Sequence, residues 1–508
     1  MGRSSKNVLN VTAGVLLLLI QAFASVAAVY QAVRSNMLPV LYLTVAIVVL
    51  ILLEVLTGFV YFHTFGKKGR GSQEEKNGIG HCLIAAALTL LITALCLIGT
   101  NVLSIANTTV DKISGQAVQG SKIAVYVLKD SPAESIQDLK DASFSLTNSY
   151  DSDKVWAAVD DINATIGSTI QTQIYDSVYT MIDTLRSGEV DAIILNEAYS
   201  GLLEEQEEYA TFADETRIVY EYEIKEEVKE AEEENDKDVN DPFILYISGS
   251  DTRSTKLVTS RSDVNLLAVV NPSSRQILLI NTPRDYYVNT AVSGGTKDKL
   301  THAGIYGIQC SMDTLGALYD EKVDHYVQVN FTGFEKLIDA IGGITVDVDQ
   351  TFTNKNGGNY SFQKGPTQMD GSKALAYVRE RYALADGDNG RGRHQMQVIS
   401  AIVSKISSGN TIVTKYADIM DSMQGTFATD MSSDAIGELV KMQLSDTGKW
   451  NVKSYAVTGT GASNVTYSMP GRKLYVMIPN QATVDHAKEL IDKVYAGDTI
   501  TDEDLKVQ

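Results

Sequence analysis

Three long apolar runs open the chain, and the pattern of hydrophobic positions changes after them. The runs cover Val8–Val33, Met37–Phe62 and Cys82–Ala106, and Glu54 is the one charged side chain within them. Each run exceeds the roughly 20 residues that a helix needs to cross a bilayer. The apolar core of a cleavable signal peptide is shorter, at about 7–15 residues. The sequence therefore predicts a membrane anchor of three retained helices over residues 1–106.

Basic residues flank these runs unequally. Arg3 and Lys6 precede the first run, four Lys or Arg residues lie within 67–76, and the link between the first two runs carries only Arg34. The positive-inside rule then places the N-terminus and the 67–76 loop in the cytoplasm. Three crossings bring everything after Ala106 to the outside. Glu54 has either a functional role or a role in helix packing or snorkelling.

After the anchor, apolar runs of strand length alternate with helical spacing. Residues 107–222 read as a small accessory α/β domain, in which Val190–Leu195 is a continuous apolar run typical of a buried strand. This domain either binds a ligand or partner or serves as a spacer. Residues 223–241 are expected to be an acidic linker, and the stretch 221–241 holds eleven acidic and three basic side chains. Cation capture is one interpretation of that stretch, and a solvated, self-repelling linker is the other.

The pattern of a larger α/β domain fills residues 242–508. Asn265–Val270 and Gln276–Asn281 are β runs joined by a Pro-containing turn, which predicts a hairpin. Apolar positions at helical spacing precede Gly342-Gly343, where we expect that helix to end. A further helix is expected to open after Gly390. The predicted fold is three transmembrane α-helices followed by extracellular α/β domains, the larger with a central mixed sheet flanked by helices.

Charge and cysteine content remove several classes of function. The net charge of −20 argues against nucleic acid as a partner, because nucleic-acid binding requires a basic surface. Cys82 and Cys96 lie in one apolar run and Cys310 is isolated, so neither a disulfide framework nor a zinc ligand set is indicated.

Arginines gather near the ends of the expected core elements of residues 242–508. They are Arg261, Arg284, Arg379, Arg381, Arg391 and Arg393. Six converging guanidinium groups would repel one another in an empty cleft, and a multiply charged anion such as phosphate would relieve that repulsion. Asp251 and Asp263 lie among them and suit Mg²⁺, which takes one or two carboxylates plus substrate phosphates. A set of surface Arg–Asp ion pairs is the alternative interpretation.

Seven short motifs extend this pattern in order along the chain. They are "GSDTR", "RSD", "TPRD", "KLTHA", "NFTGFEKLIDAIGGI", "ALAYVRER" and "DGDNGRGRHQ". Their order and intervals resemble the LytR–CpsA–Psr family of Gram-positive cell-wall ligases, most strongly over residues 241–409. Three N-terminal spans and an accessory domain resemble its capsule-type members. One departure is Arg391-Gly-Arg-His-Gln395, where many members have Arg-x-x-Arg-Gln, so no role follows for Arg393.

The resemblance implies a phosphotransferase in the cell membrane. It would move a glycan, such as capsular polysaccharide, from a polyprenyl pyrophosphate held in an apolar tunnel onto peptidoglycan, with Mg²⁺ or Mn²⁺. Capsule-assembly proteins are further partners that it suggests. Asp251 and Asp263 would hold the metal, and Asp263, Arg284 and Asp285 would be catalytic, with Asp263 or Asp285 as the base. The pyrophosphate would be held by Arg261, Arg284, Lys299, Arg379, Arg381, Arg391 and Gln395.

Two other functions are compatible with these features. A polyprenyl pyrophosphatase would use the same charged residues with water as the acceptor. A membrane sensor or transcriptional attenuator would not be an enzyme, but the predicted topology leaves only short loops in the cytoplasm. His302 and His394 are acid/base candidates, although a lone loop histidine is more often structural.

We predict that cysteine labelling of intact cells distinguishes the two sides of the membrane. A maleimide that cannot cross the bilayer should label Asn235→Cys and leave Ser72→Cys unlabelled until the cells are opened, because the positive-inside rule keeps position 72 inside. The reverse pattern would remove the extracellular assignment.

Overall fold

The computed structural model divides into two compact units, which are described one at a time. The first comprises Met1–Asp111, Val413–Asp421 and Ser432–Gly448, and the second comprises the rest of the chain. The described residues are 3–66, 72–114, 118–147, 151–203, 206–227, 240–250, 257–356, 358–407, 411–446 and 448–506.

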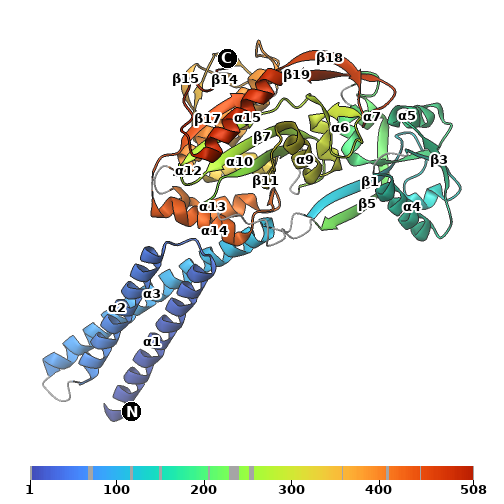
Figure 1. Cartoon of the computed structure of the whole chain (residues 1–508). Coiled ribbons are helices and arrows are strands. Elements are labelled where there is room, and N and C mark those ends of the chain that lie inside the picture. Colours follow the sequence, from blue (N-terminus) through green and yellow to red (C-terminus); the bar gives the residue numbers. More distant parts are fainter. Residues whose placement is uncertain are drawn as a thin grey trace. The chain divides into compact units, whose positions relative to one another are not determined.

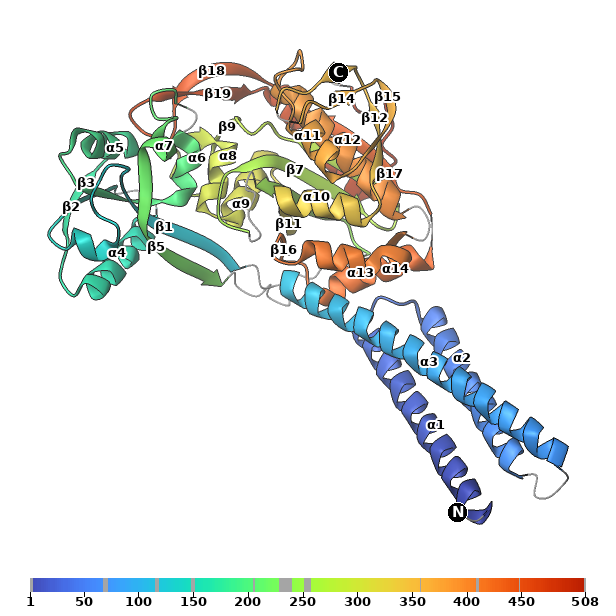
Figure 2. The same cartoon turned by 180° about the vertical axis from the view of Figure 1, so that it is seen from behind.

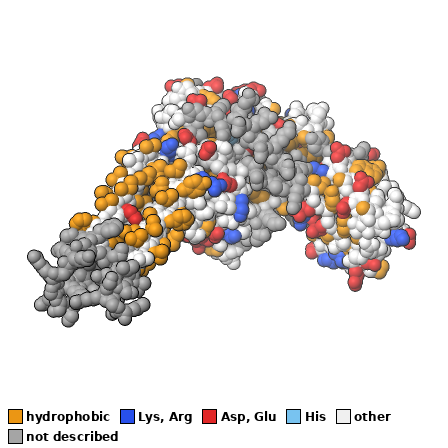
Figure 3. Space-filling model, turned by 90° about the horizontal axis from the view of Figure 1, so that it is seen from below, with side chains coloured by type: hydrophobic (Ala, Val, Ile, Leu, Met, Phe, Trp, Pro, Cys, Tyr) orange, Lys and Arg blue, Asp and Glu red, His pale blue; other side chains and the backbone are white. Residues whose placement is uncertain are grey.

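Three long apolar helices form the core of the first unit (Figure 1). They are α1 (Arg3–Arg34), α2 (Val40–Gly66) and α3 (Ser72–Ile113), and each contains a stretch long and apolar enough to cross a membrane. The three predicted apolar helices are therefore confirmed, although α3 continues past Ala106. Apolar side chains cover the described surface of these helices in Figure 3. Glu54 contacts Gln21 of α1, which favours a packing role for that carboxyl group.

Two further helices belong to the first unit. They are α13 (Thr411–Met423) and α14 (Ser433–Ser445). The Tyr416 hydroxyl of α13 lies 2.5 Å from the sulfur of Met37, between α1 and α2. In α14, the Ser433 hydroxyl donates a hydrogen bond to the Asp111 carboxylate of α3 over 3.0 Å. Polar contacts therefore join α13 and α14 to the ends of the apolar helices.

The accessory domain of the second unit is a five-stranded sheet in the order β3-β2-β4-β1-β5. Strand β2 runs parallel to β3 and β4, whereas β1 is antiparallel to β4 and β5. Its strands are β1 (Val118–Leu128), β2 (Ser143–Thr147), β3 (Gln171–Tyr175), β4 (Ala192–Asn196) and β5 (Thr216–Glu227). The main helices are α4 (Ser152–Ile166) and α5 (Val178–Ser187), with shorter turns η1 (Ile136–Leu139), η2 (Glu197–Tyr199), α6 (Ser200–Leu203) and α7 (Phe212–Glu215).

The expected acidic linker begins later than the sequence suggested. Strand β5 continues to Glu227, because alternate side chains at Tyr220, Tyr222 and Ile224 pack against the domain core while acidic residues between them face away. The part of the linker over residues 228–239 lies outside the described residues.

The larger domain is built on a six-stranded mixed sheet in the order β16-β11-β6-β7-β8-β17. The predicted hairpin is confirmed, since β7 and β8 pair antiparallel up to the Asn271–Gln276 pair. Strands β6 and β11 are parallel, as are β8 and β17. The strands are β6 (Phe243–Ser250), β7 (Ser262–Asn271), β8 (Gln276–Asn281), β11 (His325–Asn330), β16 (Phe427–Thr429) and β17 (Asn451–Ala456).

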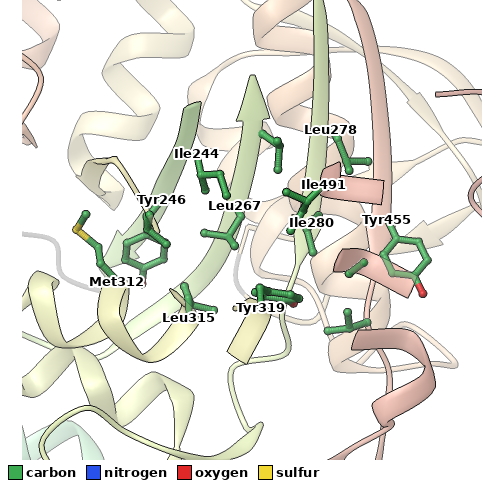
Figure 4. Packing of buried hydrophobic residues seen from close by; sticks show 14 of the residues in the cluster. Ile244, Tyr246, Leu267, Leu278, Ile280, Met312, Leu315, Tyr319, Tyr455 and Ile491 are labelled. Atoms are coloured by element: carbon green, nitrogen blue, oxygen red, sulfur yellow. The ribbon is translucent and has the colours of Figure 1, made fainter. Parts of the chain in front are cut away.

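Helices cover both faces of this sheet. On one face, α9 (Ile308–Tyr319) and α15 (Gln481–Ala496) pack on Tyr246, Leu267 and Ile280, as Figure 4 shows. On the other face lie α10 (Phe331–Ala340), α11 (Gly371–Arg379) and α12 (Asp388–Ser407), and α10 and α12 stand in front of the sheet in Figure 2. Helix α10 ends before Gly342-Gly343, both with positive φ, as the sequence predicted.

Short elements complete the second unit. They are β9 (Tyr287–Asn289), β10 (Lys297–Lys299), α8 (Leu300–Ala303), η4 (Gly304–Tyr306), β12 (Ile344–Val348), β13 (Phe352–Thr353), β14 (Ser361–Phe362), β15 (Gly365–Met369), β18 (Gly459–Val465) and β19 (Lys473–Pro479). Strands β18 and β19 form an antiparallel hairpin. The predicted fold class, three apolar helices followed by α/β domains with a mixed sheet, is confirmed.

We predict that Gly371→Ala destabilises the larger domain. A Cβ atom at this position would lie 2.2 Å from the Glu335 carbonyl oxygen of α10, so α10 and α11 would have to separate. Overpacking of this kind costs about 1–3 kcal/mol, measurable as a lower midpoint of denaturant unfolding. The neighbouring exposed Ser372→Ala is the matched control and should change stability by no more than about 0.5 kcal/mol. Equal stability of the two variants would contradict the close packing of α10 on α11.

Candidate functional site

The candidate site lies at one edge of the six-stranded sheet. Strands β6, β8 and β11 end at this edge, and β7 begins there, because β7 runs antiparallel to β6 and β8. Ser250, the last residue of β6, pairs with both Ser262 of β7 and Asn330 of β11. Residues that follow or precede these positions in the chain are therefore brought to the same edge, among them Asp263 and Arg284.

Two buried tyrosines from the core fix the chain at this edge. The Tyr246 hydroxyl lies 2.8 Å from Asn265 Oδ1 and 3.0 Å from Ser262 Oγ. The Tyr319 hydroxyl lies 2.7 Å from Thr282 Oγ1. These bonds hold the residue before Asp263 and the segment that leads into Arg284, so both charged groups stand on rigid backbone.

Helix α12 brings two more predicted residues to the site. Gly392 packs on the side chain of Asn281 at the end of β8, where an added Cβ would lie 2.2 Å from its nitrogen. This close approach turns Arg391 and Gln395 toward the sheet edge, and both are buried. The helix begins at Asp388, earlier than the predicted start after Gly390, and Asp388 forms an ion pair with Arg391.

The charged groups at the edge form one buried network. Arg284 Nη1 lies 2.5 Å from Asp263 Oδ1, and Arg284 Nε lies 3.8 Å from Asp285 Oδ2. Lys299 Nζ lies 3.1 Å from Asp285 Oδ1, and its side chain is 3% exposed. Burial by itself raises the pKa of Asp263, but Arg284, Arg391 and Arg261 together hold that pKa well below its usual range. Asp263 is therefore ionised, paired directly with Arg284 and stabilised by the positive charges of Arg391 and Arg261.

A small polar cavity lies inside this network. Its volume is about 10 Å³, which is room for about one water molecule. It is lined by Asp263, Asn281, Thr282, Pro283, Arg284, Asp388, Arg391, Gly392 and Gln395. A phosphate group could enter only if the guanidinium groups exchanged their carboxylate partners for phosphate oxygens, which are equally good bidentate acceptors.

The six arginines do not all converge as the sequence suggested. Arg393 lies within 2.7 Å of Asp349 and 2.5 Å of Asp386, and its side chain is 39% exposed. This pair matches the alternative interpretation, in which the arginines form surface ion pairs. Arg391 and Arg393 point apart because two residues on a helix are separated by about 200°.

Arg379 and Arg381 lie on aromatic rings at the end of α11. The Arg379 guanidinium carbon is 4.4 Å from the centre of the Phe331 ring, and that of Arg381 is 4.7 Å from the centre of the Tyr382 ring. Neither arginine is among the described residues that line the small cavity. Phe331 directly follows Asn330 at the same sheet edge. Their part in pyrophosphate binding stays a prediction.

The predicted metal ligands are divided between described and undescribed residues. Asp251 lies outside the described residues, but Ser250 before it pairs with Ser262, the residue before Asp263. The shared role of Asp251 and Asp263 in holding a cation, which would take two carboxylates and substrate phosphates, therefore stays a prediction. Among the described residues, no group of three or more His, Cys, Asp or Glu side chains could hold a metal by itself.

Both candidate histidines are buried and held in structural contacts. His394 stacks on Tyr377 with ring centres 3.9 Å apart, and burial lowers its pKa. His302 Nδ1 lies 2.6 Å from Asp298 Oδ1 and 2.7 Å from Ser468 Oγ. A Ser-His-Asp triad needs the serine and the aspartate on different ring nitrogens, so this group is no such triad.

A comparison with protein families identifies the larger domain. The model described as the LytR_cpsA_psr family matches residues 210–485, which is more than half of the 508-residue chain. The chain belongs to the LytR_cpsA_psr family. The residues that line the small cavity all lie within the matched range, so the charged network is a feature of the LytR_cpsA_psr domain.

Several relatives of this LytR_cpsA_psr chain are named as transferases. The polyisoprenyl-teichoic acid–peptidoglycan teichoic acid transferase TagU of Enterococcus faecalis is 35% identical over 223 residues, which cover 44% of this chain and 71% of TagU. TagU of Halalkalibacterium halodurans is 35% identical over 237 residues, covering 46% and 75%. Among solved structures, "TagT bound to LI-WTA" has a TM-score of 0.40 at 30% identity and covers 51% of this chain and 94% of TagT.

The sequence did not single out all the residues of the network. Asp388 was missed, although its position three residues before Arg391 on one helix is the spacing at which side chains meet. Tyr246 and Tyr319 were also missed, because their hydroxyl partners are distant in sequence or lie on other strands. A Tyr within an apolar strand or helix that ends beside polar residues is the one available signal.

We predict that Arg284→Lys weakens binding of a polyprenyl pyrophosphate at least tenfold, which is about 1.4 kcal/mol. Lysine keeps the charge but loses the planar fork. The matched control is Arg393→Lys, because Arg393 makes an exposed ion pair away from the cavity, and its affinity should stay within about twofold. Titration of both variants with the lipid measures the difference. An affinity of Arg284→Lys within about twofold of the unchanged protein would show that Arg284 acts only as a point charge.

Proposed function

We propose that this LytR_cpsA_psr protein is a phosphotransferase that moves a glycopolymer from a polyprenyl pyrophosphate carrier onto peptidoglycan. The observation that carries the proposal is the buried network of Arg284, Arg391 and Arg261 around Asp263. The printed names of the TagU relatives support the class of donor and acceptor. We further propose capsular polysaccharide as the glycopolymer, from the likeness to capsule-type members.

The proposed reaction breaks one phosphoanhydride bond. A hydroxyl oxygen of peptidoglycan attacks the phosphorus that carries the glycan, and the bond from this phosphorus to the bridging oxygen breaks. Polyprenyl monophosphate leaves, and the glycan becomes attached through a phosphodiester. Phosphoryl transfer depends chiefly on alignment and charge stabilisation. Arg284, Arg391 and Arg261 would supply donors to the leaving phosphate, with Lys299, Gln395, Arg379 and Arg381 as further ligands.

The proton of the acceptor hydroxyl needs a base. Asp263 and Asp285 are the candidates. The low pKa of Asp263 makes it a poor proton acceptor and a good ligand for a cation. We therefore assign the base to Asp285, which lies beside both Arg284 and Lys299.

A divalent cation fits the carboxylates of this site. Asp251 and Asp263 would hold Mg²⁺, or Mn²⁺ in its place. When bound, the cation supplies positive charge that stabilises the pyrophosphate oxygens. Asp263 would orient it from the start of β7, where the Tyr246 hydroxyl fixes the preceding Ser262.

A lipid-linked donor also explains features outside the charged network. Ile399, Ile402, Val403 and Ile406 form an apolar stripe along α12, and each is only partly buried. This stripe begins about one turn after Gln395 and would line the path of the polyprenyl chain. The three apolar helices would anchor the protein in the membrane that holds the donor. We place both α/β domains outside the cell, where peptidoglycan is located.

We predict that Asp263→Ala abolishes divalent-cation-dependent transfer by the full-length protein in lipid vesicles, with a loss of at least about 100-fold. The assay follows peptidoglycan-linked glycan and released polyprenyl monophosphate together. The control is Asp386→Ala, which removes a partner of Arg393 at a half-exposed position and should keep activity within about twofold. Full transfer by Asp263→Ala would contradict the metal role. Release of free glycan phosphate without any linked product would identify a pyrophosphatase.

A further inference from the structure

A second cavity lies between the accessory domain and the LytR_cpsA_psr domain, within the second unit. Its volume is about 330 Å³, inside the range of about 300–1,000 Å³ typical of small-ligand pockets. The accessory domain contributes Thr147, Asp176, Val178 and Tyr199. The other domain contributes Thr296, Tyr306 and the segment from Val465 to Pro470. No residue of the charged network described above lines this cavity.

The two domains share a single apolar core around this cavity. Ile305, Met469 and Leu474 of the LytR_cpsA_psr domain pack in one cluster with Leu202 and other core residues of the accessory domain. The Arg472 guanidinium pairs with Glu208 and lies 4.9 Å from the centre of the Tyr209 ring. The cavity is therefore an opening in a well-packed core, which is how protein interiors form defined binding sites.

The lining combines aromatic rings with hydroxyl and carboxylate groups. Tyr306 and Tyr467 have ring centres 6.2 Å apart, with an angle of 57° between the rings. Thr466 is 1% exposed, and its hydroxyl has no hydrogen-bond partner among the described residues. A buried hydroxyl without a partner costs free energy unless a ligand or water satisfies it. Asp176 is exposed and supplies an acceptor at the rim.

A sugar residue matches this chemistry. Its ring presents C–H faces that pack on aromatic side chains, and its hydroxyl groups donate to carboxylates and exchange hydrogen bonds with Thr and Ser side chains. A purely apolar ligand would leave the Thr466 hydroxyl unsatisfied. A phosphate would meet Asp176 without any described Lys or Arg side chain in the lining. The cavity therefore favours an uncharged, hydroxyl-rich ring.

Two of the tyrosines belong to segments that pack on Arg261. Tyr199 is two residues before Gly201, where an added Cβ would lie 3.1 Å from the Arg261 guanidinium. Tyr306 is two residues after Gly304, where an added Cβ would lie 2.7 Å from the Ser260 carbonyl oxygen and 2.8 Å from the Ser262 nitrogen. The same two short segments therefore form part of the cavity wall and pack against Arg261 of the charged network.

A third connection leads from the cavity to Lys299. Ser468 lines the cavity, and its backbone nitrogen donates to Asp298 Oδ2 over 2.9 Å. Asp298 directly precedes Lys299, which pairs with Asp285. The cavity wall is thus linked to Lys299 through Ser468 and Asp298, and to Arg261 through the segments of Tyr199 and Tyr306.

We infer that the cavity between the two domains is a sugar-binding site for the glycan that takes part in the transfer. This inference rests on the proposed function and adds a role for the accessory domain. Two sources of the sugar share the same chemistry: the glycopolymer on the lipid carrier and the peptidoglycan acceptor strand.

The test measures binding of two soluble probes to the full-length protein in detergent micelles by calorimetry. One probe is the lipid-free glycan released from the host's own lipid-linked precursor, and the other is a β-1,4-linked N-acetylglucosamine tetramer. At least one probe should bind, and Tyr467→Ala should weaken that binding at least tenfold. Tyr467→Phe keeps the ring and should stay within about threefold. Trp156→Ala removes an exposed aromatic side chain of α4 outside the cavity and should bind normally.

Thr466→Val keeps the inference testable if Tyr467→Ala folds poorly. It removes the unsatisfied hydroxyl at nearly constant shape, so its Tm should hold or rise while its affinity falls at least threefold. Binding of the released glycan alone identifies a donor site, and binding of the tetramer alone identifies an acceptor site. If neither probe binds, or if both cavity variants bind like the unchanged protein, the inference is overturned.

A last measurement separates this inference from the proposed function. Tyr467→Ala should bind polyprenyl pyrophosphate without a glycan within about twofold of the unchanged protein, whereas Arg284→Lys should keep its sugar affinity. Lipid binding that is unchanged in Arg284→Lys would contradict the proposed function, and sugar binding that is unchanged in both Tyr467→Ala and Thr466→Val would contradict the cavity assignment.

Discussion

Asp263 is a largely buried carboxylate that pairs with Arg284 and lies in the field of Arg391 and Arg261, and much of the larger domain is arranged around it. An isolated buried charge costs far more free energy than a paired one. The start of β7, the segment after β8 and the first turn of α12 must therefore reach the same sheet edge. Gly392 permits the approach of α12 to β8, since a Cβ there would collide with Asn281. The hydroxyl groups of Tyr246 and Tyr319 in the core then hold the start of β7 and the segment after β8 in place by hydrogen bonds.

The network carries almost balanced charge before any substrate binds. Its described cations are Arg261, Arg284, Arg391 and Lys299, and its described carboxylates are Asp263, Asp285 and Asp388. Mutual repulsion of arginines, which the sequence suggested, is therefore largely cancelled. When phosphate binds, the guanidinium groups would exchange their carboxylate partners for phosphate oxygens. If Asp263 turned to a cation, Arg284 would lose its carboxylate and gain phosphate oxygens, so cation and pyrophosphate would favour each other's binding.

Local hydrophobic patterns predicted the helices and strands, and the ends of those elements indicated where most of the site residues lie. Arg284 and Asp263 were predictable because both lie at the open end of one hairpin, opposite its turn. Arg393 was not, because its partner Asp349 is 44 residues away in the sequence. Helical geometry alone could have separated Arg391 from Arg393, since neighbours two apart face different directions. Arg379 is the last residue of α11 and Arg381 lies beyond it, so a local sequence pattern did not fix where their side chains point.

The accessory domain was open to two interpretations from the sequence, a binding module or a spacer. A spacer needs few contacts with its neighbour, because interfaces between independently moving domains are limited and rather polar. Here Ile305, Met469 and Leu474 enter the accessory core, and Gly201 of α6 packs on Arg261. A displacement of α6 would therefore change the surroundings of an arginine that helps to hold Asp263. Such a contact couples the accessory domain to the charged network through van der Waals packing, and a spacer would not require it.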